Sequence, residues 1–365
     1  MYTLTMPKKV MVARGEWQRV LNEQLALQQC TRPFLLYSGS VWRRHAVVID
    51  GATYYEMPTG EPTLAMLEQV LARIDTHDAV VAIGGGSVID MAKAVAALAR
   101  NKTVPFEQLC TQAVERVPFI AIPTTAGTGS EATKVAVLTD EAAQKKVNPA
   151  HEQLVPDVAI LDATLTTTLP LHITAFTALD ALTHAIEAYV STEANMFSDM
   201  YAEQAIALLA RGLQQIQQAP DDVDVREQLL LGSFYAGVAF SNASTNLAHA
   251  TGRALGVLAH LPHGQSVALM HPFVVTFSYE ACQARYDRIA ELLQTKNVAL
   301  YLMQLNVDFH VWESARHLVP LLAQQKEQLT QLALSGNGIQ TNRRIPTAQN
   351  ITHLFTQLQQ TLGGL

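Results

Sequence analysis

The sequence predicts a two-domain protein, with an α/β domain in its first half and an all-α domain in its second half. Three observations lead to this fold class. The chain has 365 residues, more than one hydrophobic core normally organises. Short apolar runs alternate with helical patterns up to about residue 165, and helical patterns dominate afterwards. We therefore expect an α/β domain over residues 1–165 and an all-α domain over residues 166–365.

Continuous apolar runs in the first half are typical of strands that are buried on both faces. They lie at 33–37, 46–49, 79–83, 119–122 and 158–161. Helical spacing of apolar residues separates some of them, over 62–74 and 88–98. Buried strands that alternate with helices indicate a parallel sheet covered on both faces.

The second half shows amphipathic or apolar helical patterns after a break at Pro170. Because proline interrupts the hydrogen bonding of a helix, we expect Pro272 to end or kink the helix that contains it. A segment rich in glycine, asparagine and arginine, 336–346, is expected to be a loop. The predicted helices cover 175–191, 199–217, 225–240, 245–255, 265–277, 286–294 and 351–362.

Composition excludes several classes of protein. Apolar residues make up 49% of the chain and charged residues 16%, which favours a well-packed globular protein. The net charge is −7 without a basic run, so neither nucleic acid nor an anionic membrane is an expected partner. No apolar run has the length of a signal peptide or a membrane span. The widely spaced Cys30, Cys110 and Cys282 form no disulfide framework and favour the cytoplasm.

Two polar segments follow buried strands and are suited to a dinucleotide. In Gly84-Gly85-Gly86-Ser87, glycines allow close approach to a pyrophosphate, and the next helix offers unpaired N–H groups. This segment departs from the G-x-G-x-x-G pattern of Rossmann domains. The second segment, 123–130, offers hydroxyls to the nicotinamide ribose and to phosphate: Thr124, Thr125, Thr128 and Ser130. The alternative for each segment is a tight strand-to-helix turn without a ligand.

A carboxylate and histidines form a candidate metal site in the second half. Asp180 and His184 are four residues apart, so on a helix they share one face, and their neighbours are apolar. A straight helix from His249 to His263 would span about 21 Å, so the helix must end between them, and Gly256 is the expected end. One carboxylate and three histidines suit Fe(II), Zn(II) or another divalent transition ion. The alternative for Asp180 and His184 is a hydrogen-bonded core pair.

Together these segments resemble the iron-containing (group III) alcohol dehydrogenases over residues 30 to 280. Gly84–Ser87 with Asp90 and Lys93 resembles the G-G-G-S-x-x-D-x-A-K motif of that family. Residues 124–131 resemble its T-T-x-G-T-G-S-E segment, and 156–162 its P-x-x-x-x-x-D strand. Residues 180–189 read D-A-L-T-H-A-I-E-A-Y, close to the family's ligand helix, and 262–264 match its P-H-G.

The resemblance implies a dehydroquinate synthase-like fold, with the site in the cleft between an N-terminal dinucleotide-binding domain and an all-α C-terminal domain. It implies an oxidoreductase that transfers a hydride between NAD(H) or NADP(H) and a small alcohol or aldehyde, in a homodimer or larger homo-oligomer. It also implies that Asp90 belongs to the cofactor site, and that Fe(II) or Zn(II) binds to Asp180, His184, His249 and His263.

Two positions depart from the family pattern. Arg253 replaces a histidine that relays the alcohol proton, and arginine cannot exchange protons near neutral pH. We therefore expect Arg253 to bind an anionic substrate; the alternative is an arginine that forms a salt bridge on its helix. In either case His260, His271 or solvent would carry the proton. Ser38 replaces an aspartate that repels the 2′-phosphate, and with Arg43 and Arg44 nearby it predicts that NADPH is accepted.

Two other functions stay open at this stage. One is a dehydroquinate synthase-like lyase, although that enzyme has fewer histidine ligands and a glutamate in place of Asp180. The other is a catalytically silent protein that binds a nucleotide or a metal, since Arg253 removes one functional group.

Overall fold

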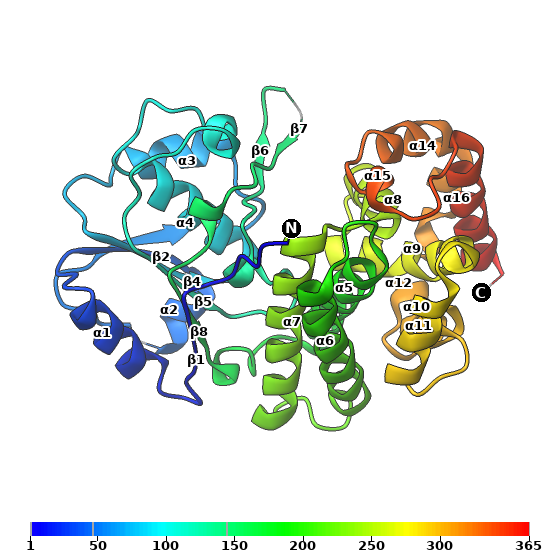
Figure 1. Cartoon of the computed structure of the whole chain (residues 1–365), viewed down its shortest axis with the longest axis horizontal. Coiled ribbons are helices and arrows are strands. Elements are labelled where there is room, and N and C mark those ends of the chain that lie inside the picture. The colour runs from blue at the N-terminus through cyan, green and yellow to red at the C-terminus, as the bar shows by residue number, and fades with distance from the viewer. Residues whose placement is uncertain (1, 46, 144, 365) are drawn as a thin grey trace.

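The computed structural model describes residues 2–45, 47–143 and 145–364. An α/β part and a helical part lie side by side, and the chain enters the helical part at α5 (Figure 1). Residues before the first strand run along the helical part, where the backbone N–H and C=O of Thr5 both bond to the Asn242 side chain at 2.9 Å. The two parts are therefore also joined by the N-terminal segment.

Parallel strands in the order β1-β8-β5-β4-β2-β3 form the central sheet. Gly84 at the end of β4 is in register with Pro123 at the end of β5, so the two loops that follow leave the sheet side by side. The strands are β1 Lys9–Val12, β2 Pro33–Ser38, β3 Thr53–Met57, β4 Ala79–Gly84, β5 Phe119–Pro123 and β8 Val158–Leu161.

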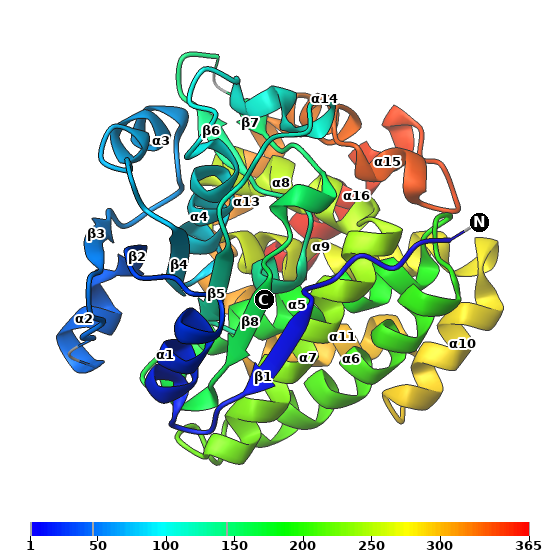
Figure 2. The ribbon, with the colours of Figure 1, turned by 60° about the vertical axis from the view of Figure 1, so that its left-hand side comes forward.

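Helices cover both faces of this sheet (Figure 2). The helices α1 Trp17–Leu27 and α2 Gly39–His45 share one apolar cluster with strand residues such as Leu35 and Ile83. The helices α3 Leu64–Leu71 and α4 Gly86–Leu98 share another with the alternate residues Leu36 and Ala82. Each central strand is therefore apolar on both sides, which confirms the parallel α/β arrangement expected from the continuous apolar runs.

The strand expected at 46–49 is wrong over its described residues 47–49. Val47 and Ile49 are buried in the cluster beneath α1, but they pair with no strand. The chain turns at Asp50 and Gly51, and the edge strand is β3. In edge strand β3 only Met57 is buried and the other residues are exposed or half-buried, so this strand lacks the continuous apolar run of the inner strands.

A two-stranded antiparallel hairpin, β6 Leu138–Asp140 and β7 Lys145–Val147, projects from the α/β part toward the helical part (Figure 1). The Glu61 carboxylate holds it, because it accepts from Lys146 Nζ at 2.7 Å and from Thr139 Oγ1 at 3.1 Å.

The helical part forms one apolar core, to which all the predicted helices contribute. Shorter helices between 298 and 341 were not expected, and one of them, α15, lies inside the predicted 336–346 loop. The helices are α5 Leu171–Val190, α6 Met196–Gln215, α7 Val223–Ala243, α8 Leu247–Ala259, α9 His263–Ser278, α10 Gln283–Leu292, α11 Val298–Asp308, α12 Val311–Ser314, α13 Val319–Gln324, α14 Lys326–Leu334, α15 Gly338–Thr341 and α16 Ala348–Gly363. None of the described helices is long and apolar enough to span a membrane.

Two helix ends differ from expectation. Helix α9 continues through Pro272, because the Asn306 side chain donates at 2.8 Å to the Ala268 carbonyl that proline leaves without a partner. Helix α8 does not end at Gly256 but at Ala259, where His260 takes a left-handed conformation with φ of 52°. The chain then turns back to His263, as the spacing of the two histidines requires.

Arg226 ties α7 to the segment that joins the two parts. The side chain is buried and donates to the carbonyls of Thr166, Leu169 and Pro220, and to Thr174 Oγ1. Thr166 and Leu169 lie between β8 and α5. One guanidinium therefore satisfies several polar groups in the connection from sheet to helices.

We expect Arg226→Met to destabilise the protein by about 3 kcal/mol, because it leaves buried carbonyls without donors. Thermal unfolding followed by circular dichroism measures this loss. The control is Arg211→Met on α6, where the arginine is exposed and, among the described residues, bonds only to the Ala207 carbonyl of its own helix. Equal effects of the two substitutions would contradict the role given to Arg226.

Candidate active site

A cleft of about 470 Å³ lies between the carboxyl edge of the sheet and the helices α5, α7 and α8. Both parts of the chain contribute side chains to it. The α/β part contributes Gly86, Ser87, Asp90, Thr128, Ser130 and Lys134, and the helical part contributes Asp180, His184, Phe240, Ser244, Thr245, His249, Arg253 and His263.

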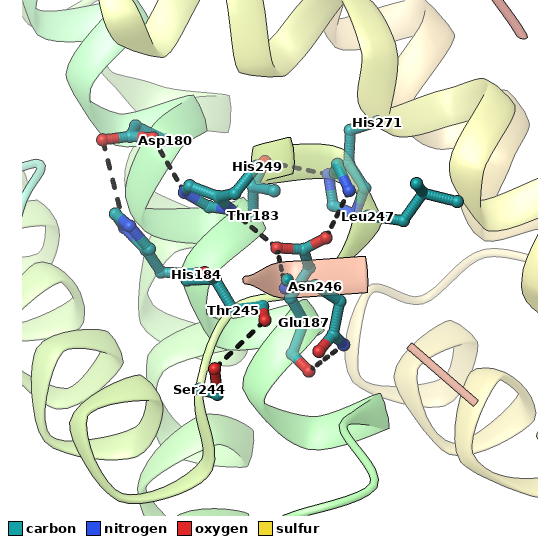
Figure 3. Close-up of polar contacts among 12 residues, drawn as sticks. Asp180, Thr183, His184, Glu187, Ser244, Thr245, Asn246, Leu247, His249 and His271 are labelled. Carbon is teal, nitrogen blue, oxygen red and sulfur yellow. Dashed lines mark hydrogen bonds and ion pairs between the residues drawn. The ribbon is translucent and has the colours of Figure 1, made fainter. Parts of the chain in front are cut away.

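The structure brings the four predicted metal ligands together in this cleft. Asp180 and His184 lie one turn apart on α5, and His249 reaches them from α8 (Figure 3). Asp180 Oδ1 lies 3.4 Å from His249 Nε2 and 3.7 Å from His263 Nε2. Potential ligand atoms of Asp180, His184 and His249 all lie within 4.8 Å of one another. His263 begins α9 and is the most exposed of the four, at 40%.

These side chains fit a metal ion better than they fit one another. Asp180 Oδ1, His184 Nδ1 and His249 Nε2 are buried and have no hydrogen-bond partner. Each such atom costs about 1–3 kcal/mol if it stays unpaired. A divalent ion of the iron or zinc type takes carboxylate and imidazole ligands of this kind. The donor set therefore matches the ion that the sequence motifs imply.

Electrostatics at the cluster also favour a cation. Burial lowers the pKa of His184 to about 3, so its ring is neutral and able to act as a ligand. Burial also opposes a charge on His249, but the carboxylates of Glu187 and Asp180 outweigh burial and raise the pKa of His249 to about 9. Although burial raises the pKa of Asp180, the surrounding histidines hold it below its usual range. The field around His249 therefore attracts positive charge.

Glu187 orients His249, and the sequence analysis did not identify it. Its carboxylate lies 2.6 Å from His249 Nδ1, which leaves Nε2 facing Asp180. It also accepts from the backbone N–H groups of Asn246 at 2.8 Å and Ala248 at 2.6 Å, at the start of α8 (Figure 3). The signal was present in the sequence, because positions 180, 184 and 187 fall on one helix face.

Ring stacking further restricts the histidines. The His184 ring lies between Phe240 and His249, with centroids 4.3 Å and 4.2 Å away and interplanar angles of 17° and 25°. This arrangement limits rotation of the His184 side chain, so less order has to be imposed when a ligand binds.

The two predicted nucleotide segments lie against each other at the carboxyl edge of the sheet. A methyl group on Gly86 would lie 2.7 Å from Thr128 Oγ1, so only glycine permits this approach. Gly85 precedes α4 without a side-chain cap, which leaves N–H groups at the start of that helix for an anion. Of the predicted cofactor-binding residues in these segments, Gly86, Ser87, Thr128 and Ser130 line the cleft, whereas Gly84, Gly85, Thr124 and Thr125 do not.

Gly129 brings the second segment into direct contact with α7. Its φ is +59°, and a methyl group there would lie 2.7 Å from the Cα of Gly237. Both the backbone conformation and the contact therefore require glycine. This contact fixes the distance between the predicted nucleotide segments and the helices that carry the predicted metal ligands.

Asp90 lies in the cleft beside a buried lysine. Lys93 donates to Thr133 Oγ1 at 2.7 Å and to the Val135 carbonyl at 2.5 Å, and its Nζ lies 3.5 Å from Asp90 Oδ1. Asp90 Oδ2 accepts from the Val137 N–H, while Oδ1 has no hydrogen-bond partner. Glu131, also buried and missed by the sequence analysis, has a pKa raised by burial to about 7. This cluster holds the 130–137 segment against α4.

Ser38 ends β2 and does not line the cleft described above. Charges of both signs surround it. A methyl group on Gly39 would lie 2.1 Å from Glu56 Oε1 and 3.3 Å from Arg43 Nη1. Glu56 was not considered from the sequence, and it places a carboxylate near the position where the family aspartate is absent.

The residues predicted to handle substrate or proton lie in different places. Arg253 lines the cleft, one turn after His249 on α8. His260 is exposed at the end of α8 and does not line the cleft, so its position argues against the proton-transfer role. His271 is buried behind the site, where its Nδ1 lies 2.9 Å from Thr183 Oγ1.

Fold and site together define a class of two-part proteins, in which glycine-rich segments of a parallel sheet face a buried cluster of carboxylate and histidines. Family models match both parts. The model of the iron-containing alcohol dehydrogenases matches residues 7–163, and that of the C-terminal part of the Fe-containing alcohol dehydrogenase family matches residues 174–359. The chain belongs to the iron-containing alcohol dehydrogenase family, which confirms the resemblance seen in the motifs.

Individual relatives agree with this assignment. The chain is 43% identical to the probable alcohol dehydrogenase EutG of Escherichia coli over 67% of this chain, but over only 63% of that protein's length. It is 34% identical to the NAD-dependent methanol dehydrogenase of Bacillus methanolicus over 76% of each chain. The solved structure of a 1,3-propanediol oxidoreductase has a TM-score of 0.89 at 28% identity, covering 98% of this chain and 100% of the other.

We expect Glu187→Gln to weaken metal binding by roughly tenfold to a hundredfold, because residues that orient a metal ligand contribute to affinity. The amide N–H₂ of glutamine would face one of the N–H groups that now donate to the Glu187 carboxylate, so the His249 ring would lose its fixed orientation. Competition for Zn(II) with a chromophoric chelator measures the affinity without an activity assay. Glu280→Gln, at an exposed glutamate, is the control. Wild-type affinity in Glu187→Gln would show that His249 is oriented without Glu187.

Proposed function

We propose that this protein is a metal-dependent alcohol dehydrogenase or aldehyde reductase that uses NAD(H) or NADP(H). The observation that carries this proposal is the set of buried, unpaired donor atoms of Asp180, His184 and His249 in the same cleft as the start of α4. The activities of the related alcohol and methanol dehydrogenases support it.

Asp180, His184, His249 and His263 would hold Fe(II) or Zn(II). The ion supplies a Lewis acid for an alcohol or carbonyl oxygen, and the nicotinamide supplies or accepts the hydride. Glu187 keeps the His249 ring in place through the bond to Nδ1. Because His260 lies outside the cleft and the His263 side chain is 40% exposed, we expect the alcohol proton to pass to solvent beside His263.

The α/β part would hold the cofactor. The uncapped start of α4 suits the pyrophosphate, because its N–H groups and the helix dipole both favour an anion. Thr128 and Ser130 offer hydroxyls at the cleft wall, where their Oγ atoms lie 3.0 Å apart. Asp90 Oδ1, which has no hydrogen-bond partner, offers an acceptor for a hydroxyl or amide of the cofactor.

Location and assembly are part of the proposal. We expect a cytoplasmic protein, in agreement with the unpaired state of Cys30, Cys110 and Cys282. We also expect a homodimer or larger homo-oligomer, as the family resemblance implies.

The test uses protein purified without oxygen and loaded with Fe(II) or with Zn(II). We expect turnover of short aldehydes, measured as loss of NADPH or NADH absorbance, and expect a chelator to abolish it. His249→Ala should lose both bound metal and turnover, whereas His353→Ala, at an exposed histidine on α16, should keep both. No turnover with either metal and either cofactor would overturn the proposal in favour of a lyase or a silent binding protein.

Cofactor choice gives a second prediction, namely that NADPH is accepted at least as well as NADH. Ser38 carries no carboxylate, and Arg43 attracts a 2′-phosphate, while Glu56 opposes it. Glu56→Gln should therefore shift the ratio of kcat/KM for NADPH over NADH upward by roughly tenfold, and Arg43→Ala should shift it downward. A strong preference of the wild type for NADH would contradict the prediction.

A further inference from the structure

Arg253 is a partly buried charged side chain for which the structure provides no countercharge. Its Nε donates at 3.2 Å to the His249 carbonyl of the same helix. Across residues 2–45, 47–143 and 145–364, no carboxylate lies within ion-pair distance of its guanidinium. The salt-bridged helix arginine considered from the sequence is therefore absent.

Glu187, the carboxylate that attracts Arg253 electrostatically, is already paired with other groups. It accepts from two backbone N–H groups and faces the His249 ring. Arg253 therefore stays underpaired in the protein without ligand.

Other enclosed arginines show that this is unusual for the chain. Arg226 is more deeply buried, but it donates to four oxygen atoms. Arg116 forms a two-bond pair with Asp157, with both distances at 2.8 Å. Within the described part of the chain, Arg253 has a single hydrogen bond, to a carbonyl, and its position in the cleft wall makes it accessible to a ligand.

The cleft that Arg253 lines offers uncharged polar groups as well as charged ones. Ser244 and Thr245 line the same cleft, and Ser244 has φ of +67°, a strained conformation for a residue other than glycine. The carboxylates that line this cleft face other groups or solvent: Glu61 is paired with Lys146, Asp90 lies beside Lys93, Asp180 lies beside His249, and Glu193 is exposed. Lys134 adds a second cation without an ion pair among the described residues.

We propose that the substrate is a short aldehyde, or the matching alcohol, that carries an oxyanion group, and that Arg253 binds this group. This inference rests on the proposed dehydrogenase function. Arg253 lies four residues after His249, so their Cβ atoms are about 6 Å apart. A short molecule can therefore place its reacting carbon at the metal cluster and its carboxylate, sulfonate or phosphonate on the guanidinium. A planar guanidinium matches such groups through two parallel hydrogen bonds.

The test compares two aldehydes of equal carbon number, neutral butanal and anionic succinic semialdehyde. In the wild type, kcat/KM should favour the anion. In Arg253→Met, the ratio of kcat/KM for the anion over butanal should fall by about tenfold to a hundredfold, mainly through KM of the anion. Arg253→Lys, which keeps the charge but not the two-bond geometry, should lie between them. Arg211→Met should leave the ratio as in the wild type.

An unchanged ratio in Arg253→Met would overturn the inference while chelator-sensitive turnover of butanal still upholds the proposed function. The inference also fails if the substitution raises KM for NADPH alone, because the guanidinium then serves the cofactor.

Calorimetric titration with propanesulfonate, a poor metal ligand, tests the anion site without any turnover. Binding by the wild type that is lost in Arg253→Met supports the inference even if no aldehyde is reduced, an outcome that would defeat only the proposed function. No binding by the wild type, or equal binding by both proteins, overturns it.

Discussion

The carboxylate of Glu187 connects the helix that carries Asp180 and His184 to the helix that carries His249. It accepts the backbone N–H groups of Asn246 and Ala248, so it supplies the cap that the Asn246 side chain does not provide for α8. A negative charge at a helix N-terminus is favourable, and burial strengthens the interaction. The same carboxylate faces the His249 ring. The start of α8, the orientation of the predicted metal ligand His249 and the direction of Arg253 one turn later all depend on this interaction.

One contact between the α/β part and the helical part is made by backbone rather than by side chains. Gly129 touches Gly237 on α7, and this places the hydroxyl segment of the α/β part directly against the helical part. Arg226 and the N-terminal segment add further links between the two parts. A cofactor on the sheet and a metal on the helices would thus face each other at a distance set by close packing, which tolerates little adjustment.

Charge inside the molecule is almost everywhere matched by a partner. Lys93 lies with Asp90 and two oxygen acceptors, and Arg226 lies among carbonyls. Several exceptions line one cleft, where the potential ligand atoms of Asp180, His184 and His249 and the Oδ1 of Asp90 lack hydrogen-bond partners, and where Arg253 lacks a countercharge among the described residues. Buried Glu131 Oε1 also has no hydrogen-bond partner among those residues. Because unpaired buried polar groups are costly, their concentration in one cleft indicates that ligands complete it. The cation expected at the cluster and the anion expected at Arg253 are complementary to these two sets.

Local patterns in the sequence were sufficient for much of this description. Strands such as 79–83 could be recognised because burial on both faces requires a continuous apolar run, and Asp180 with His184 because four residues make one helical turn. The division at residues 165 and 166 stays a prediction. Tertiary structure decided the features that depend on partners distant in the sequence. The edge strand is β3 rather than 46–49, and α9 continues through Pro272 because Asn306 donates to the Ala268 carbonyl. The contact between the Glu187 carboxylate and the His249 ring is a third such feature. Tertiary structure also decided that Arg253 has no acidic partner among the described residues. Whether an ion pair forms depends on how separate helices pack, and the spacing of residues along one helix does not specify this.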